Sequence, residues 1–124
     1  MIKIIIPAIL FVLIDFFYLQ SISSFFKKQI YSIQNAPLKL NIVSTLLCYL
    51  FLIIGIYYFI IKDRKPVKDA FLLGLVIYMV FETTNKALLT NWKWSTVLMD
   101  GLWGGILFAI TTFLTYKIYK LLKL

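Results

Sequence analysis

Apolar residues occupy long, nearly unbroken runs in this chain of 124 residues. A helix needs about 20 apolar residues, each rising about 1.5 Å, to cross a hydrocarbon core of about 30 Å. Four runs reach that length, and the short polar segments between them leave no room for a further domain. The sequence therefore predicts an all-α integral membrane four-helix bundle, a single domain over residues 1–124, with spans near residues 4–21, 40–61, 70–89 and 96–116.

The first run has an alternative interpretation as a cleavable signal peptide. Lys3 precedes it, and Ser21, Ile22 and Ser23 form a small-x-small pattern typical of a cleavage site. Two features favour a transmembrane helix. The run exceeds the roughly 7–15 apolar residues of a signal core, and it contains a charged Asp15.

A short interfacial helix is predicted between the first two spans. Its apolar side chains share one helical face: Ile22, Phe25, Phe26 and Ile30. Lys27 and Lys28 fall off that face, as in helices that lie along the membrane surface. Asn35 is a favoured helix cap and Pro37 suits a first helical turn, so the next helix is expected to begin there.

The composition supports lipid as the solvent and limits the kinds of catalytic or metal site that the chain can form. The chain is 62% hydrophobic with a mean hydropathy of +0.93, well above the apolar content of about 45–50% in soluble domains. It contains no histidine, which removes the commonest general base and the usual zinc and haem ligands. Cys48 is the only cysteine, so no disulfide forms within the chain. No cofactor is predicted.

The distribution of lysine and arginine predicts the orientation, because cytoplasmic loops carry the excess of these residues. One side of the bundle would hold Lys3, Lys62, Arg64, Lys65, Lys68, Lys117, Lys120 and Lys123. The other side would hold Lys27, Lys28, Lys39, Lys86 and Lys93. Both termini are therefore predicted to be cytoplasmic. The net charge of +8 forms no dense patch, so the expected partner is the lipid bilayer and no nucleic acid.

Three carboxylates lie within the predicted spans: Asp15, Glu82 and Asp100. Placing an ionisable group at bilayer depth costs at least about 2.5–3 kcal/mol, so such groups usually face the bundle interior and mark functional sites. In the predicted topology all three fall in the outer half of the membrane, roughly 6–12 Å from its boundary. We therefore expect them to form one outer polar site.

Several neighbouring residues are candidates for the same site. Thr84 and Asn85 follow Glu82, and Trp103 carries an indole N–H that can donate to a carboxylate or a ligand. Lys86 lies four residues after Glu82 and is a candidate counter-ion. The second span adds a polar stripe, Asn41, Ser44, Thr45 and Cys48, in its outer half. The sequence does not identify a metal for this site.

Other polar and small residues have simpler interpretations. Hydroxyls such as those of Thr83, Thr84 and Ser44 readily bond to carbonyls of their own helix. Trp92 and Trp94 are expected to anchor the outer connection at the membrane interface. Helix packing is expected of a small-xxx-small stripe in the fourth span, Gly101, Gly105 and Ala109.

At these residues the sequence resembles a family of small predicted bacterial membrane proteins known as domain of unknown function 2177. The family's first helix carries Asp-x-x-Trp-Leu, matched by Asp15, Tyr18 and Leu19. Its third helix carries Asp-x-Thr-Asn and then a Trp, matched by Glu82, Thr84, Asn85 and Trp92. Its fourth carries Asp-x-x-Trp-Gly, matched by Asp100, Trp103 and Gly104. The resemblance spans nearly the whole chain and implies that these segments form one unit, without implying an activity.

Three functions are compatible with this pattern. The favoured one is a site that binds or conducts a proton, a cation or a small polar ligand. The first alternative is a structural role, in which buried polar groups fix helix register and the glycine stripe recruits a second copy or another membrane protein. The second alternative is a membrane-embedded acid–base enzyme acting on a lipid. Because no nucleophile elbow or cofactor fingerprint is present, the sequence favours a protein that is not an enzyme.

Overall fold

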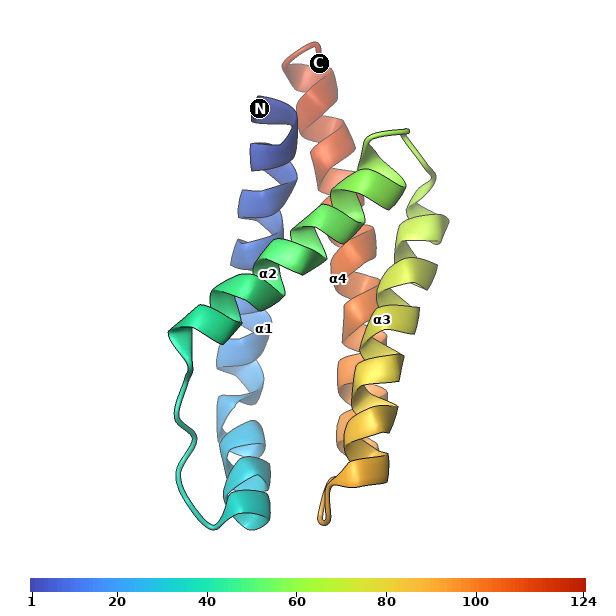
Figure 1. Ribbon diagram of the computed structural model, residues 1–124. Coiled ribbons are helices and arrows are strands. Elements are labelled where there is room, and N and C mark those ends of the chain that lie inside the picture. Colours follow the sequence, from blue (N-terminus) through green and yellow to red (C-terminus); the bar gives the residue numbers. More distant parts are fainter.

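The computed structural model describes all residues 1–124 and contains only helices (Figure 1). The chain forms α1 (Ile2–Gln34), α2 (Ile42–Ile56), a π-helical turn η1 (Tyr57–Ile61) that continues α2, α3 (Val67–Leu88) and α4 (Trp94–Leu121). The predicted all-α class is confirmed. The long apolar runs dictate this outcome, since a helix satisfies its backbone hydrogen bonds internally wherever water is absent.

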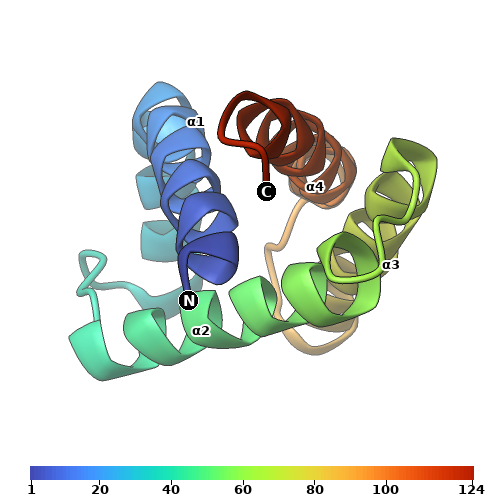
Figure 2. The same ribbon diagram turned by 90° about the horizontal axis from the view of Figure 1, so that it is seen from above.

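The four helices are not equivalent in the bundle. α3 and α4 form an antiparallel hairpin with extensive contacts, and α1 packs along α4. α2 lies obliquely across the others, as the view from above shows (Figure 2). It approaches α3 at the α2–α3 turn and diverges from it toward its own N-terminus (Figure 1).

Three helical segments are long and apolar enough to cross a membrane: Ile2–Gln34, Ile42–Ile61 and Trp94–Leu121. α3 is not one of them, although it has 22 residues. It carries Lys68, Asp69, Glu82 and Lys86, which lower its apolar character. A helical membrane bundle is thus confirmed, and the crossing of α3 stays a prediction.

The expected separate interfacial helix is not present, because α1 continues without a break from Ile2 to Gln34. No proline or glycine interrupts the segment after Leu19. Its side chains also contact the α3–α4 connection, where Phe26 meets Trp92 edge to face at 6.1 Å between ring centroids. The apolar face predicted for the membrane surface therefore serves partly as a packing face within the bundle.

The predicted helix start at Asn35 and Pro37 is wrong as well. Asn35 ends α1 in the left-handed conformation, with a φ of 54°, which asparagine tolerates better than most residues. α2 begins only at Ile42, and the side chain of Asn41 caps it by accepting a hydrogen bond from the Ser44 backbone N–H at 3.0 Å. The sequence contained two asparagines suited to capping, and local composition did not distinguish them.

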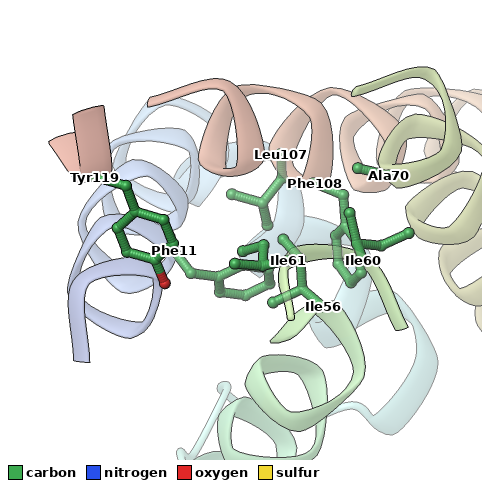
Figure 3. Packing of buried hydrophobic residues seen from close by; sticks show 8 residues of the cluster. All are labelled: Phe11, Ile56, Ile60, Ile61, Ala70, Leu107, Phe108 and Tyr119. Carbon is green, nitrogen blue, oxygen red and sulfur yellow. The ribbon is translucent and has the colours of Figure 1, made fainter. Parts of the chain in front are cut away.

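The apolar core includes Ile60, Ile61 and Tyr119, which lie near the end of the bundle that holds both termini. Figure 3 shows how the core residues pack. Phe11 of α1 meets Phe108 of α4 edge to face at 5.5 Å, and Ile56, Ile60 and Ile61 enter from the second helix. Many large apolar side chains outside this core face outward, including Phe17, Val43 and Phe51. An outer surface of this kind suits lipid contact.

Contacts at the same end tie three distant segments together. The Tyr119 hydroxyl donates to the carbonyl of Lys3, and the Tyr116 hydroxyl donates to the carbonyl of Lys65 at 2.6 Å. Arg64 lies over the ring of Tyr119, 4.6 Å from its centroid. The N-terminus, the α2–α3 turn and the C-terminus therefore share one end, as the distribution of basic residues predicts.

Candidate functional site

Asp15 is the centre of a polar cluster in the middle of the bundle. It is buried on α1 and accepts two hydrogen bonds from other helices. The indole N–H of Trp103 on α4 donates to Oδ1 at 2.9 Å, and the hydroxyl of Tyr49 on α2 donates to Oδ2 at 2.5 Å. One carboxylate thus joins three helices through neutral donors.

Tyr18 extends this cluster to the second aspartate. Its ring stacks on Trp103 with centroids 4.3 Å apart and planes at 4°. Its hydroxyl donates to Oδ1 of Asp100 at 3.2 Å. Because Tyr18 lies one turn after Asp15 and Trp103 lies three residues after Asp100, the two aromatic rings bridge the two acids.

Glu82 is fully buried on α3 and lies next to Asp100. Its Oε1 accepts a hydrogen bond from the indole N–H of Trp92 at 2.9 Å, while its Oε2 is buried without a hydrogen-bond partner. The carboxyl group of Asp100 is its acidic neighbour. Two neighbouring carboxylates repel each other unless a proton or a cation lies between them.

The expected ion pair between Glu82 and Lys86 is not formed. Oε1 of Glu82 accepts from Trp92 and Oε2 has no hydrogen-bond partner, while the ammonium of Lys86 lies over the ring of Trp94, 5.6 Å from its centroid. Glu82 points into the bundle while Lys86 reaches toward its end. The acid cluster therefore receives no counter-charge from this lysine.

Two other candidates lie beside the cluster without joining its hydrogen bonds. The Thr84 hydroxyl is exposed and donates to the Val80 carbonyl of its own helix at 2.6 Å. Thr83 does the same toward Met79. Asn85 is half-buried on the turn after Glu82. Of the residues predicted to bind a ligand, the structure thus brings together Asp15, Glu82, Asp100 and Trp103.

Two adjoining hollows open beside the acids. The polar hollow, about 300 Å³, is lined by Asp15, Ser44, Thr45, Cys48, Tyr49, Leu52 and Tyr78. The apolar hollow, about 180 Å³, is lined by Cys48, Leu52, Ile77, Tyr78, Phe81 and Asp100. Part of the polar stripe predicted on the second span therefore faces Asp15. The three acids do not converge on one point as a metal centre would, and no group of three or more Cys, Asp or Glu side chains has that arrangement.

The aromatic donors are the main site residues that reasoning from residue types missed. Trp92, expected to be an interfacial anchor, is buried and bonds to Glu82, whereas Trp94 is exposed as an anchor would be. Tyr18 and Tyr49 also lacked a predicted role in the site. The available signal was the family pattern, in which Tyr18 and Trp92 occupy motif positions.

Close packing of α3 on α4 positions Glu82 beside Asp100. Gly101 lies against Met79 and Gly105 against Phe71, so the glycine stripe faces α3 of the same chain. Ala109, the third member of the stripe, is half-buried. A side chain at Gly104 would overlap Tyr78, although the helical pattern did not assign Gly104 to this contact.

A family model described as "predicted membrane protein (DUF2177)" matches residues 1–117. The chain belongs to the DUF2177 family. This confirms the resemblance found in the sequence and, with the three apolar spans, an integral membrane location. No curated protein and no solved structure matches this DUF2177 member. The matched region contains every residue of the acid cluster, and the family description assigns it no activity.

Proposed function

We propose that this DUF2177 member binds, or lets pass, a proton, a cation or a small cationic or polar ligand at its acid cluster. The observation that carries this proposal is the Glu82–Asp100 pair, in which two carboxyl groups are neighbours and one buried oxygen of Glu82 has no hydrogen-bond partner. A proton or a cation between the two groups would relieve their repulsion. No lysine or arginine hydrogen-bonds to either carboxylate.

The environment of the acids strengthens this proposal. An ionised carboxylate in apolar surroundings is costly unless it is paired or hydrogen-bonded. Asp15 has two neutral donors, Trp103 and Tyr49, which stabilise a negative charge without cancelling it. The cluster as a whole therefore keeps an attraction for a positive ligand.

Access from the outer half of the membrane is part of the proposal. Glu82 lies six residues before the end of α3, and Asp100 lies six residues after the start of α4. At about 1.5 Å per residue, both lie roughly 9 Å from that end of the hairpin. We expect four crossings with cytoplasmic termini, which would turn this end outward.

The binding role is preferred over a structural role for a specific reason. A structural role predicted that the glycine stripe would recruit another chain. Gly101 and Gly105 instead contact α3 within the same chain, so this stripe is already covered.

The test uses the purified protein in proteoliposomes. Proton flux and uptake of methylammonium are measured across a range of pH for the wild type and for Asp15→Asn and Asp100→Asn. We expect saturable, pH-dependent binding or flux that both substitutions strongly reduce. Asp63→Asn, an exposed acid in the α2–α3 turn, is the matched control and should leave it unchanged. Absence of any saturable signal, or equal signals in all variants, would refute the proposal.

A further inference from the structure

We infer that the ligand is a lipophilic ammonium compound, which enters sideways from the lipid between α2 and α3. Its ammonium group would lie between Asp15 and Asp100, and its apolar body would fill the apolar hollow. This inference rests on the proposed binding function and names the class of ligand.

The apolar hollow is poorly suited to a small hydrated cation. Apart from Asp100, its walls are Cys48, Leu52, Ile77, Tyr78 and Phe81. A metal ion or a hydrated ammonium would find few oxygen ligands there to replace its water. A ligand with a hydrocarbon part binds more favourably when that part fills the same space, because apolar surface is then removed from water.

The two hollows adjoin, and together they are complementary to an amphipathic ligand. They share Cys48, Leu52 and Tyr78, so a single molecule can occupy both. Asp15 lies on the wall of the polar hollow and Asp100 on the wall of the apolar one. Because no lysine or arginine lines either hollow, a cation is favoured over an anion.

The opening between α2 and α3 faces the lipid side of the bundle. α2 diverges from α3 below the turn that joins them (Figure 1), and it lies across the bundle in the view from above (Figure 2). Phe81, at the rim of the apolar hollow, is 56% exposed, and Cys48 is also exposed. Since the surrounding helix faces are apolar, the molecules that meet this opening are lipids and lipid-soluble compounds.

Cys48 provides a direct readout, because it is the only cysteine in the chain and contacts both hollows. The rate of its alkylation by a lipid-soluble maleimide is measured in proteoliposomes with four probes: decylammonium, methylammonium, decanol and decanoate. We expect decylammonium to slow alkylation severalfold at a concentration where the other three have little effect. The protection should be saturable and should be lost in Asp15→Asn and Asp100→Asn.

Two variants separate this inference from the proposed function. Ile77→Trp narrows the apolar hollow and should reduce protection by decylammonium to a larger degree than it changes the proton or methylammonium signal. Phe81→Leu, a milder change at the rim, should weaken protection in the same direction if Ile77→Trp fails to fold. Phe51→Trp is the control on the outward face of α2, where Phe51 is 67% exposed.

The possible outcomes are distinct. Protection by decylammonium alone, with loss in the aspartate variants, supports the inference. Equal protection by decanol would overturn it, since charge would then not be recognised. Methylammonium binding or flux without any decylammonium protection would overturn it too while leaving the proposed function intact. If no probe binds and the aspartate variants match the wild type, both proposals fail.

Discussion

Tyrosine and tryptophan side chains let this protein keep three acids inside an apolar bundle. Each ring is apolar enough to be buried in the helix bundle, and each carries one polar atom that can donate a hydrogen bond. Trp103 and Tyr49 donate hydrogen bonds to Asp15. Tyr18 donates to Asp100, and Trp92 donates to Glu82. These donors satisfy carboxylate oxygens and leave the negative charge in place.

Trp103→Phe tests the importance of one such donor. Phenylalanine keeps a ring that can stack on Tyr18 but removes the N–H that bonds to Asp15. We expect a loss of about 1.5–3 kcal/mol in stability, the usual worth of a hydrogen bond to a charged group. Thermal or denaturant unfolding in detergent measures it. Trp94→Phe, at an exposed position, is the control, and an equally small effect for both would contradict the assigned role.

At the scale of elements, the α3–α4 hairpin determines which acids meet. Gly74, Gly101, Gly104 and Gly105 allow the two helix backbones to approach closely. This approach brings Glu82 of α3 beside Asp100 of α4. α1 is fixed to the same hairpin by Gln29, whose Oε1 accepts hydrogen bonds from the Lys93 backbone N–H and the Thr96 hydroxyl.

Gly104→Ala and Gly55→Ala form a matched pair that tests this close approach. A Cβ at Gly104 overlaps Tyr78, whereas a Cβ at Gly55 in α2 meets nothing within 4 Å. We expect Gly104→Ala to destabilise the bundle by about 1–3 kcal/mol through overpacking. Gly55→Ala should be neutral or stabilising by roughly 0.5–1 kcal/mol, because alanine favours the helix. The free energy of unfolding in detergent is measured for both variants. A neutral Gly104→Ala would contradict the expectation and show that α4 can shift freely.

At the scale of the whole molecule, the oblique path of α2 creates the hollows beside the acids. Cys48 and Leu52 of α2 line both hollows, opposite residues of α3 such as Tyr78. The contacts of Tyr116, Tyr119 and Arg64 hold the α2–α3 turn at the end that carries both termini. The bundle is therefore closed at that end, and α2 and α3 separate away from it.

The predicted orientation can be tested with single cysteines in a Cys48→Ala background. Lys65 lies in the α2–α3 turn and Lys93 in the α3–α4 connection, and both are exposed. If α3 crosses the membrane, Lys93→Cys should react with an impermeant maleimide from outside intact cells. Lys65→Cys should react only after permeabilisation. Labelling of both from the same side would show that α3 does not cross.

The sequence by itself determined the membrane class, the helical fold and the presence of three acids within the helices. These follow from the length of the apolar runs and from the high cost of charge in lipid, which are properties of segments. Only the tertiary structure decided that α1 continues to Gln34, that Lys86 lies over Trp94 and that Trp92 bonds to Glu82. Each of these depends on which side chains from distant segments come within reach, and neither helical periodicity nor composition contains that information.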